Sequence, residues 1–384
     1  MSRAYDAIVI GAGHNGLTCA CYLARAGLSV LVLERRPVVG GAAVTEEFHP
    51  GFRNSLAAYT VSLLHPQVIA DLNLADHGLK ILPRETANFL PLPGGDGLLA
   101  SADADEFRAE IARFSERDAA ALPGYLAHIE MLADILRREL LVTPPNPGRA
   151  ARGLVAGGRL FRRLGRLGRA RQQALLEVLT LSAAEFLDRW FEHDAVKALF
   201  GFDAIVGNYT TPYSAGTAYV LLHHVFGEVN GERGRWGHAV GGMGAITQAL
   251  AAEAAKLGVE IVTDAPVASV AVDGGSARGV RLPDGRQYRA PVVAANVHPQ
   301  RLFLDLIEAH ELPSDFLAAI RRYRSGSGVF RMNVALKELP DFTARPGTDV
   351  AAHHRSGIVI APDLDYMDRA WRDARRDGWS AEPI

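Results

Sequence analysis

A glycine-rich turn between a short apolar run and a helical stretch constrains the fold of this chain most strongly. The apolar run covers 7–10, and the turn that follows reads GAGHNG at 11–16. A second apolar run, at 30–33, ends at Glu34. Runs that are apolar on both faces are typical of buried parallel strands. The order of strand, glycine turn, helix and strand predicts a Rossmann-like unit within an α/β fold.

Each glycine of the turn has a role that a side chain would prevent. Gly11 allows the tight turn, Gly13 lets the backbone approach a pyrophosphate, and Gly16 permits close packing of the helix against the strand. The N-terminus of the helix then faces the phosphates. A carboxylate at Glu34 is placed to accept hydrogen bonds from the ribose of an adenosine. The turn predicts a bound dinucleotide, and a glycine turn without a ligand is the simpler alternative.

Two more glycines follow the second strand at an informative distance. Five residues separate Glu34 from Gly40 and Gly41. The pattern Glu-x5-Gly-Gly at this point resembles the extended fingerprint of the amine-oxidase and phytoene-desaturase flavoproteins, in which the second glycine pair leaves room beside the diphosphate of an extended FAD. An ordinary loop is the simpler explanation of the pair alone. The two motifs together favour FAD over NAD.

The resemblance extends to a phytoene-dehydrogenase-like subgroup of that family and runs loosely over nearly the whole chain. It is carried by four stretches: GAGHNGL at 11–17, ERRPVVGGAAVTEE at 34–47, HPGF at 49–52 and GRWGHAVGGMGAITQAL at 234–250. The resemblance implies FAD as the cofactor, with the backbone of Val267 facing the adenine. We therefore expect the following residues to bind FAD: Gly11, Ala12, Gly13, Asn15, Gly16, Glu34, Arg35, Gly40, Gly41, Ala42 and Val267.

Hydrophobic periodicity predicts the remaining elements. From about residue 90 toward Phe200, apolar residues three or four apart predict long helices. The later elements that we expect are a helix at 245–257, strands at 259–262, 267–272 and 292–295, hairpin turns at Gly274-Gly275 and Asp284-Gly285, and a helix at 364–376. Alternation of apolar and other residues at 330–336 predicts a half-buried strand that forms a wall of the substrate cavity.

These elements predict two domains. A discontinuous FAD-binding domain, of the type shared by the amine oxidases, takes 1–90 and 235–305. A largely helical, partly β substrate or cap domain takes 91–234 and 306–384. In the resembling family the chain continues with further strands, a glycine-rich segment that covers the flavin and a closing helix, and nothing before Ile384 matches that segment. The chain is therefore expected to be a shortened relative or a truncated product, with an open flavin pocket.

Charge and cysteine content exclude several classes of function. A net charge of −2 gives no global attraction for nucleic acid. The two cysteines, Cys19 and Cys21, lie two apart in a predicted helix, so they cannot form a disulfide, and no CxxC dithiol is present. We expect a soluble, cytoplasmic protein without a metal site. With one dinucleotide motif, we expect an oxidase, dehydrogenase or desaturase that is reoxidised by oxygen, a quinone or a diffusible acceptor.

Hydride transfer to flavin N5 needs no fixed catalytic motif, because the cofactor supplies the chemistry. The candidates for proton transfer are His65, His223, His224 and His238, and each is more simply a structural or surface histidine. The candidates for contact with the flavin or substrate are Arg53, Tyr59, Gly241, Gly242 and Met243. The catalytic residue, the substrate and the oligomeric state stay open.

A basic segment at 149–171 holds eight arginines and no acidic residue. It is interleaved with leucines and Phe161, so it predicts either an amphipathic helix that contacts an anionic membrane or a solvated, mobile lid, which its glycines favour. Overall, the sequence predicts an FAD-dependent oxidoreductase acting on an apolar or lipid-like substrate. The alternatives are a non-catalytic dinucleotide-binding protein and an NAD-dependent dehydrogenase.

Overall fold

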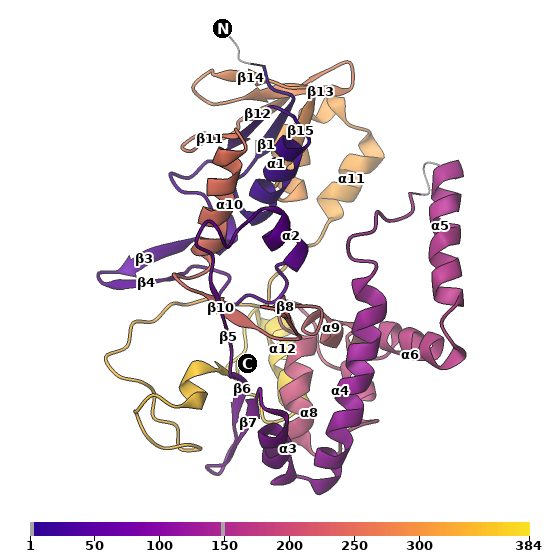
Figure 1. The fold of residues 1–384 in the computed structure, drawn as a ribbon, viewed down its shortest axis with the longest axis vertical. Helices are drawn as coiled ribbons and strands as arrows, with labels where there is room; N and C mark the ends of the chain where they lie inside the picture. The colour runs from indigo at the N-terminus through magenta and orange to yellow at the C-terminus, as the bar shows by residue number, and fades with distance from the viewer. Residues whose placement is uncertain (1–3, 147–149) are drawn as a thin grey trace. The chain divides into compact units, whose positions relative to one another are not determined.

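The computed structural model describes residues 4–146 and 150–384, and the chain divides into two compact units (Figure 1). Unit 1 consists of Met1–Pro83, Gly237–Gly326 and Arg331–Ala335. Unit 2 consists of Arg84–Trp236, Ser327–Phe330 and Leu336–Ile384. Each unit has a hydrophobic core of its own.

A four-stranded parallel sheet forms the centre of unit 1, in the order β11-β2-β1-β15. Its strands are β1 (Ala7–Ile10), β2 (Val30–Leu33), β11 (Glu260–Val262) and β15 (Val292–Ala295). Helices α1 (His14–Arg25) and α10 (Gly244–Lys256) lie side by side against this sheet (Figure 1). The elements expected at the N-terminus are thus confirmed.

The two faces of the parallel sheet pack against different layers. Val9 and Val32 join the core under α1 and α10, whereas Ile8 and Leu31 pack toward a three-stranded antiparallel sheet. That sheet contains β12 (Ser269–Asp273), β13 (Ser276–Arg281) and β14 (Gln287–Arg289). Because β1 and β2 are covered on both faces, their sequences are apolar throughout. The three layers confirm the α/β fold.

Shorter elements complete unit 1. They are β3 (Thr45–His49), β4 (Phe52–Ser55), α2 (Pro66–Asp71), β5 (Ile81–Pro83), β10 (Gly237–Ala239) and α11 (Ser314–Arg322). β3 pairs with β4 and β5 pairs with β10, both antiparallel. The short strand β10 therefore precedes the glycines at 241–242. It belongs to a two-stranded sheet and does not begin a second dinucleotide-binding unit.

Unit 2 is mainly helical. Its helices are α3 (Ala104–Ala112), α4 (Glu116–Arg137), α5 (Ala150–Gly165), α6 (Arg169–Thr180), α7 (Ala183–Leu187), α8 (Asp194–Gly201), α9 (Ala218–His223) and α12 (Leu364–Asp377). Its strands are β6 (Thr86–Pro91), β7 (Gly97–Ser101), β8 (Glu228–Val229), β9 (Glu232–Arg233) and β16 (Gly357–Ile358). β16, β6 and β7 form one sheet.

Aromatic residues fill the core of unit 2 around α4. The ring of Tyr125 lies 4.8 Å from that of Phe200 and 5.0 Å from that of Phe191, measured between ring centres. By length and composition α4 is apolar enough to cross a membrane. Its residues Leu122, Tyr125 and Ile129 are nevertheless buried against other helices of the unit. Burial in a protein core accounts for the apolar character of those positions.

The boundaries between the units differ from those expected at 90/91, 234/235 and 305/306. Residues 84–90 belong to unit 2, because β6 pairs with β7 and β16. Residues 306–326 belong to unit 1, because Leu306 is buried in its core and α11 packs on the π-helical turn at Arg301–Leu306. Periodicity identifies elements, but only pairing and packing decide which unit holds them.

The prediction of a strand at 330–336 is wrong. Within the described residues this run forms no ladder with another strand. Its apolar side chains are exposed, with Phe330 at 88% and Met332 at 66%, while Asn333 bonds the backbone oxygen of Ser55. Alternation determines which side chains share a face of an extended chain. It does not supply a neighbouring strand to hydrogen-bond with it.

The packing of α1 leads to a test of the core. Leu17 is fully buried between the parallel sheet and α10, so Leu17→Ala should lower the free energy of unfolding by about 2–5 kcal/mol. Leu28→Ala, in the same β1-α1-β2 unit but 38% exposed, is the matched control and should cost far less. Urea denaturation of both variants measures the difference. Equal losses in the two variants would contradict the packing of α1.

Candidate dinucleotide-binding site

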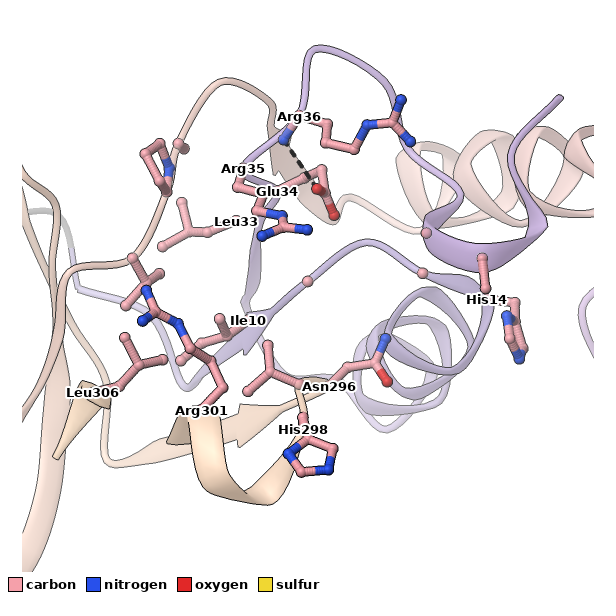
Figure 2. A pocket seen from close by; sticks show the side chains of 18 residues that line it. Ile10, His14, Leu33, Glu34, Arg35, Arg36, Asn296, His298, Arg301 and Leu306 are labelled. Carbon is pink, nitrogen blue, oxygen red and sulfur yellow. Dashed lines mark hydrogen bonds between the residues drawn. The ribbon is translucent and has the colours of Figure 1, made fainter. Parts of the chain in front are cut away.

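A pocket of about 640 Å³ lies at the carboxyl-terminal edge of the parallel sheet in unit 1. Because the strands run parallel, β1, β2 and β15 all end at this edge. The pocket is lined by the glycine turn, the end of β2, the loop at 265–267 and the segment that follows β15 (Figure 2). In open α/β sheets, ligands bind in the crevice at this edge.

The glycine turn is packed too closely for side chains. A Cβ atom on Gly16 would lie 2.1 Å from the backbone oxygen of Gly11, so Gly16 is required for the turn and α1 to meet. Gly11 itself has a φ of +96°, which favours glycine. Gly13 caps α1 and supplies no side-chain hydrogen bond to its first turn. The first amides of α1 are therefore open to an anionic ligand.

Glu34 connects two parts of the site. Glu34 is 6% exposed, and one carboxylate oxygen accepts a hydrogen bond from the backbone nitrogen of Ala12 at 2.8 Å. The other accepts a hydrogen bond from the backbone nitrogen of Arg36 at 3.0 Å (Figure 2). The carboxylate therefore fixes the glycine turn and the chain after β2. Glu34 lines the pocket and each carboxylate oxygen keeps a second lone pair, so the expected ribose contact is compatible with this geometry.

The segment that holds Gly40 and Gly41 packs against the glycine turn at 11–16. The backbone nitrogen of Gly40 donates to the oxygen of Ala12 at 2.9 Å. Gly41 has a φ of +56°, and a Cβ atom there would lie 3.1 Å from the Cα of Gly13. Gly41 lines the pocket, whereas Gly40 is buried against Val44. The pair lets two backbone segments meet beside the pocket.

Basic side chains outnumber acidic ones among the residues that line the pocket. Arg35, Arg36 and Arg301 contribute guanidinium groups, and Glu34 is the one acidic residue in the lining. Arg36 pairs with Glu46, and Arg301 pairs with Asp305 at 2.8 Å. The charges and the open helix N-terminus together suit a diphosphate.

The structure divides the expected FAD-binding residues into two groups. Those that line the pocket are Gly11, Gly13, Glu34, Arg35, Gly41, Ala42 and Val267. Ala12, Asn15, Gly16 and Gly40 do not line it. Ala12 contributes its backbone to the bonds with Glu34 and Gly40, and Gly16 and Gly40 are needed for packing. The side chain of Asn15 is exposed.

Sequence reasoning missed the contribution of the segment after β15. Asn296 donates its backbone nitrogen to the oxygen of Ile10 at 2.8 Å, and its side chain lies against Gly13 and Gly16. His298, Arg301 and Leu306 also line the pocket (Figure 2). The available signal was the predicted strand at 292–295, because the residue after a parallel strand reaches the same edge as the glycine turn.

The unit 1 candidates for proton transfer and for contact with flavin or substrate lie outside the pocket lining. His65 caps α2 by accepting a hydrogen bond from the nitrogen of Gln67, which is a structural role. An exposed ring nitrogen of His238 lies 3.1 Å from the oxygen of Tyr59. Arg53 lies on β4, Gly241 and Gly242 form a turn before α10, and the nitrogen of Met243 donates to the hydroxyl of Ser55. None of these contacts identifies a catalytic group.

The remaining histidine candidates lie in unit 2. His223 is exposed, whereas His224 is buried and stacks on Trp236 with ring centres 4.7 Å apart. Burial lowers the pKa of His224 to about 4, so its ring is neutral near pH 7. Burial also raises the pKa of Asp203 to about 7, although Arg84 opposes the shift. The His224 Nδ1 to Asp203 Oδ1 distance is 3.8 Å, too long for a hydrogen bond.

The two thiols are unsuited to redox chemistry. Both cysteines are free, and burial raises the pKa of Cys21 to about 12 and shifts that of Cys19 upward. The reactive form of a cysteine is the thiolate, so neither residue is activated. Among the residues that the structure describes, no group of His, Cys, Asp and Glu side chains is arranged to hold a metal ion.

Comparison with known proteins identifies relatives over most of the chain. The profile of a family described as flavin containing amine oxidoreductase matches residues 16–340. A Rattus norvegicus protein, pyridine nucleotide-disulfide oxidoreductase domain-containing protein 2, is 39% identical over 99% of this chain and 69% of its own length. A phytoene desaturase (lycopene-forming) from Pantoea ananas is 29% identical over 79% of this chain and 57% of its own.

Solved structures resemble the fold. Putrescine oxidase bound to putrescine superimposes with a TM-score of 0.53 at 20% sequence identity, over 84% of this chain and 64% of that one. The chain thus spans less than two thirds of the length of this structure. At such identity the match concerns the fold, and it agrees with the α/β architecture of unit 1.

The partly buried Asp203 in unit 2 predicts a pH-dependent stability. The folded-state pKa of Asp203 is raised from 3.8 to about 7, so ionisation of Asp203 costs stability progressively as the pH rises through that window. Asp203→Asn removes this cost. The variant should gain stability relative to the wild type between about pH 4 and about pH 7, and keep the gain above it.

Urea denaturation of both proteins across this pH range measures the effect. His224 is unchanged in the variant, and its own titration contributes to both proteins. A stability difference that does not vary with pH would contradict the raised pKa of Asp203.

Proposed function

The chain belongs to the flavin-containing amine oxidoreductase family, and we propose that it is an oxidoreductase that binds FAD in the pocket of unit 1 and oxidises an apolar or lipid-like substrate. The observation that carries the proposal is the meeting of Gly13 and Gly41 beside the open N-terminus of α1, within a pocket lined by arginines.

The residues of the pocket fit the parts of FAD. The diphosphate would lie against the backbone of Gly11 and Gly13, the first amides of α1, and Gly41 with Ala42. Glu34 would accept hydrogen bonds from the ribose of the adenosine half. The loop at Val267 and the side chain of Leu306 offer an apolar wall for the adenine. A Cβ atom at Gly13 or Gly41 would narrow this cradle.

The flavin supplies a hydride acceptor, so this chain has to bind and orient the substrate and exclude water. Oxidation removes a hydride and a proton from the substrate. Oxygen, a quinone or a diffusible carrier then takes the two electrons, because the sequence has one dinucleotide motif. Similarity to a phytoene desaturase supports an apolar or lipid-like substrate. We expect the protein to act in the cytoplasm.

The first experiment is the visible absorption spectrum of the purified chain with and without added FAD. A bound-flavin spectrum that bleaches anaerobically with an apolar substrate supports the proposed enzyme. A bound flavin that a chemical reductant bleaches but no substrate does indicates a non-catalytic binding protein. A chain that binds NAD and never retains flavin would overturn the cofactor assignment.

A glycine substitution tests the site directly. Gly41→Ala places a Cβ atom 3.1 Å from Gly13 at a φ of +56°, so FAD affinity should fall roughly tenfold or more. Gly51→Ala is the matched control, because Gly51 has a φ of +82° with no atom within 4 Å of its Cβ position and does not line the pocket.

Fluorescence titration measures the affinity of each variant for FAD. The unfolding transition of each variant measures the loss of stability that an alanine at positive φ causes at either position. Equal affinities in the two variants would place the diphosphate away from Gly41.

A further inference from the structure

Helix α5 separates basic and apolar side chains onto two faces. At 100° per residue, Arg159, Arg162 and Arg163 fall on one side of the helix. Leu160, Phe161 and Leu164 fall on the other side. The segment forms a helix although several glycines occur in it (Figure 1). Arg149 lies outside the described residues.

The basic face has little to neutralise it. The run at 149–171 contains eight arginines and no acidic residue, in a chain whose net charge is −2. Arg163 pairs with Glu139 at 2.7 Å. Arg159, Arg162 and Arg166 are exposed, and no acidic side chain in the described parts of the chain pairs with them. This surface therefore attracts anions, although the whole molecule does not.

Exposed apolar side chains accompany the arginines. Phe161 is 80% exposed. The ion pair between Arg163 and Glu139 brings α5 beside the segment after α4, where Leu140 and Leu141 are also exposed. Leu164 is half-buried and packs against the core, which attaches α5 to its unit. The surface thus offers both positive charge and apolar groups to the solvent.

We propose that α5 and the segment after α4 form a docking surface for an anionic lipid bilayer. The bilayer interface provides phosphate-bearing headgroups for the arginines and hydrocarbon for Phe161 and Leu141 at the same boundary. A nucleic acid would pair with the arginines but leave the apolar side chains in water. The proposed docking is a property separate from flavin binding. Docking would bring the enzyme to the phase in which the lipid-like substrate of the proposed function dissolves.

Vesicle flotation with the full chain tests the electrostatic part. The probes are phosphatidylcholine vesicles with and without phosphatidylserine. The wild type should bind the anionic vesicles selectively, and raised salt should release it. The triple variant Arg159→Gln/Arg162→Gln/Arg166→Gln should bind them about a hundredfold more weakly. The matched control is Arg321→Gln/Arg322→Gln/Arg324→Gln, which loses the same charge from exposed positions of unit 1 and should bind like the wild type.

Phe161→Ala tests the apolar part. It should weaken vesicle binding by about tenfold or more while keeping the preference for phosphatidylserine, because the arginines remain. Phe330→Ala, at another exposed phenylalanine, is the matched control.

Far-ultraviolet circular dichroism and flavin content confirm that each variant is folded, and flavin content also tests the proposed function separately. The inference is overturned if the wild type does not bind anionic vesicles, if both arginine triples bind equally, or if the chain binds DNA in a way that depends on Arg159, Arg162 and Arg166 but ignores vesicles.

Discussion

The hydrogen bonds of the Glu34 carboxylate join the two turns that border the pocket of unit 1. One oxygen binds the amide of Ala12 in the turn after β1, and the other binds the amide of Arg36 after β2. Backbone hydrogen bonds from Gly11 to Leu33 and from Gly40 to Ala12 join the same two segments. Because the carboxylate is nearly buried, these two charge-assisted bonds are stronger than they would be in water. The shape of the pocket follows from them, since each turn forms one of its walls.

The parts of the fold that could be predicted are those in which local sequence and tertiary position agree. β1, α1 and β2 were expected from apolar runs and a glycine turn, and their three-layer burial explains why those runs have no polar face. The run at 330–336 shows the opposite case. Its alternation is a property of the chain itself, whereas a strand needs a partner, and no local pattern states which segment will lie beside it.

The candidate site was predictable to a similar degree and for a similar reason. Glycines leave a sequence signal because a side chain would clash or strain the backbone, so Gly11, Gly13 and Gly41 were found. Asn296 and Arg301 have no such signal, since their place in the pocket arises from the parallel pairing of β15 with β1. The histidine candidates stay predictions, because the contacts of these side chains do not test a role in proton transfer. A single histidine with no acidic or nucleophilic residue at a fixed spacing does not identify a catalytic site. The position of His224 depends on its packing against Trp236.

Net charge is a poor guide to partners when charges are unevenly distributed. The chain is close to neutral, yet it has two surfaces suited to anions, which use different physics. The pocket presents backbone amides and glycines in a fixed geometry, so it selects a ligand by shape and can hold a single diphosphate. Arg159 and Arg162 of α5 are long and exposed, so they favour a surface of many negative charges without requiring any one arrangement. The first kind of site suits a cofactor that must be oriented for hydride transfer, and the second suits a bilayer, whose lipids move.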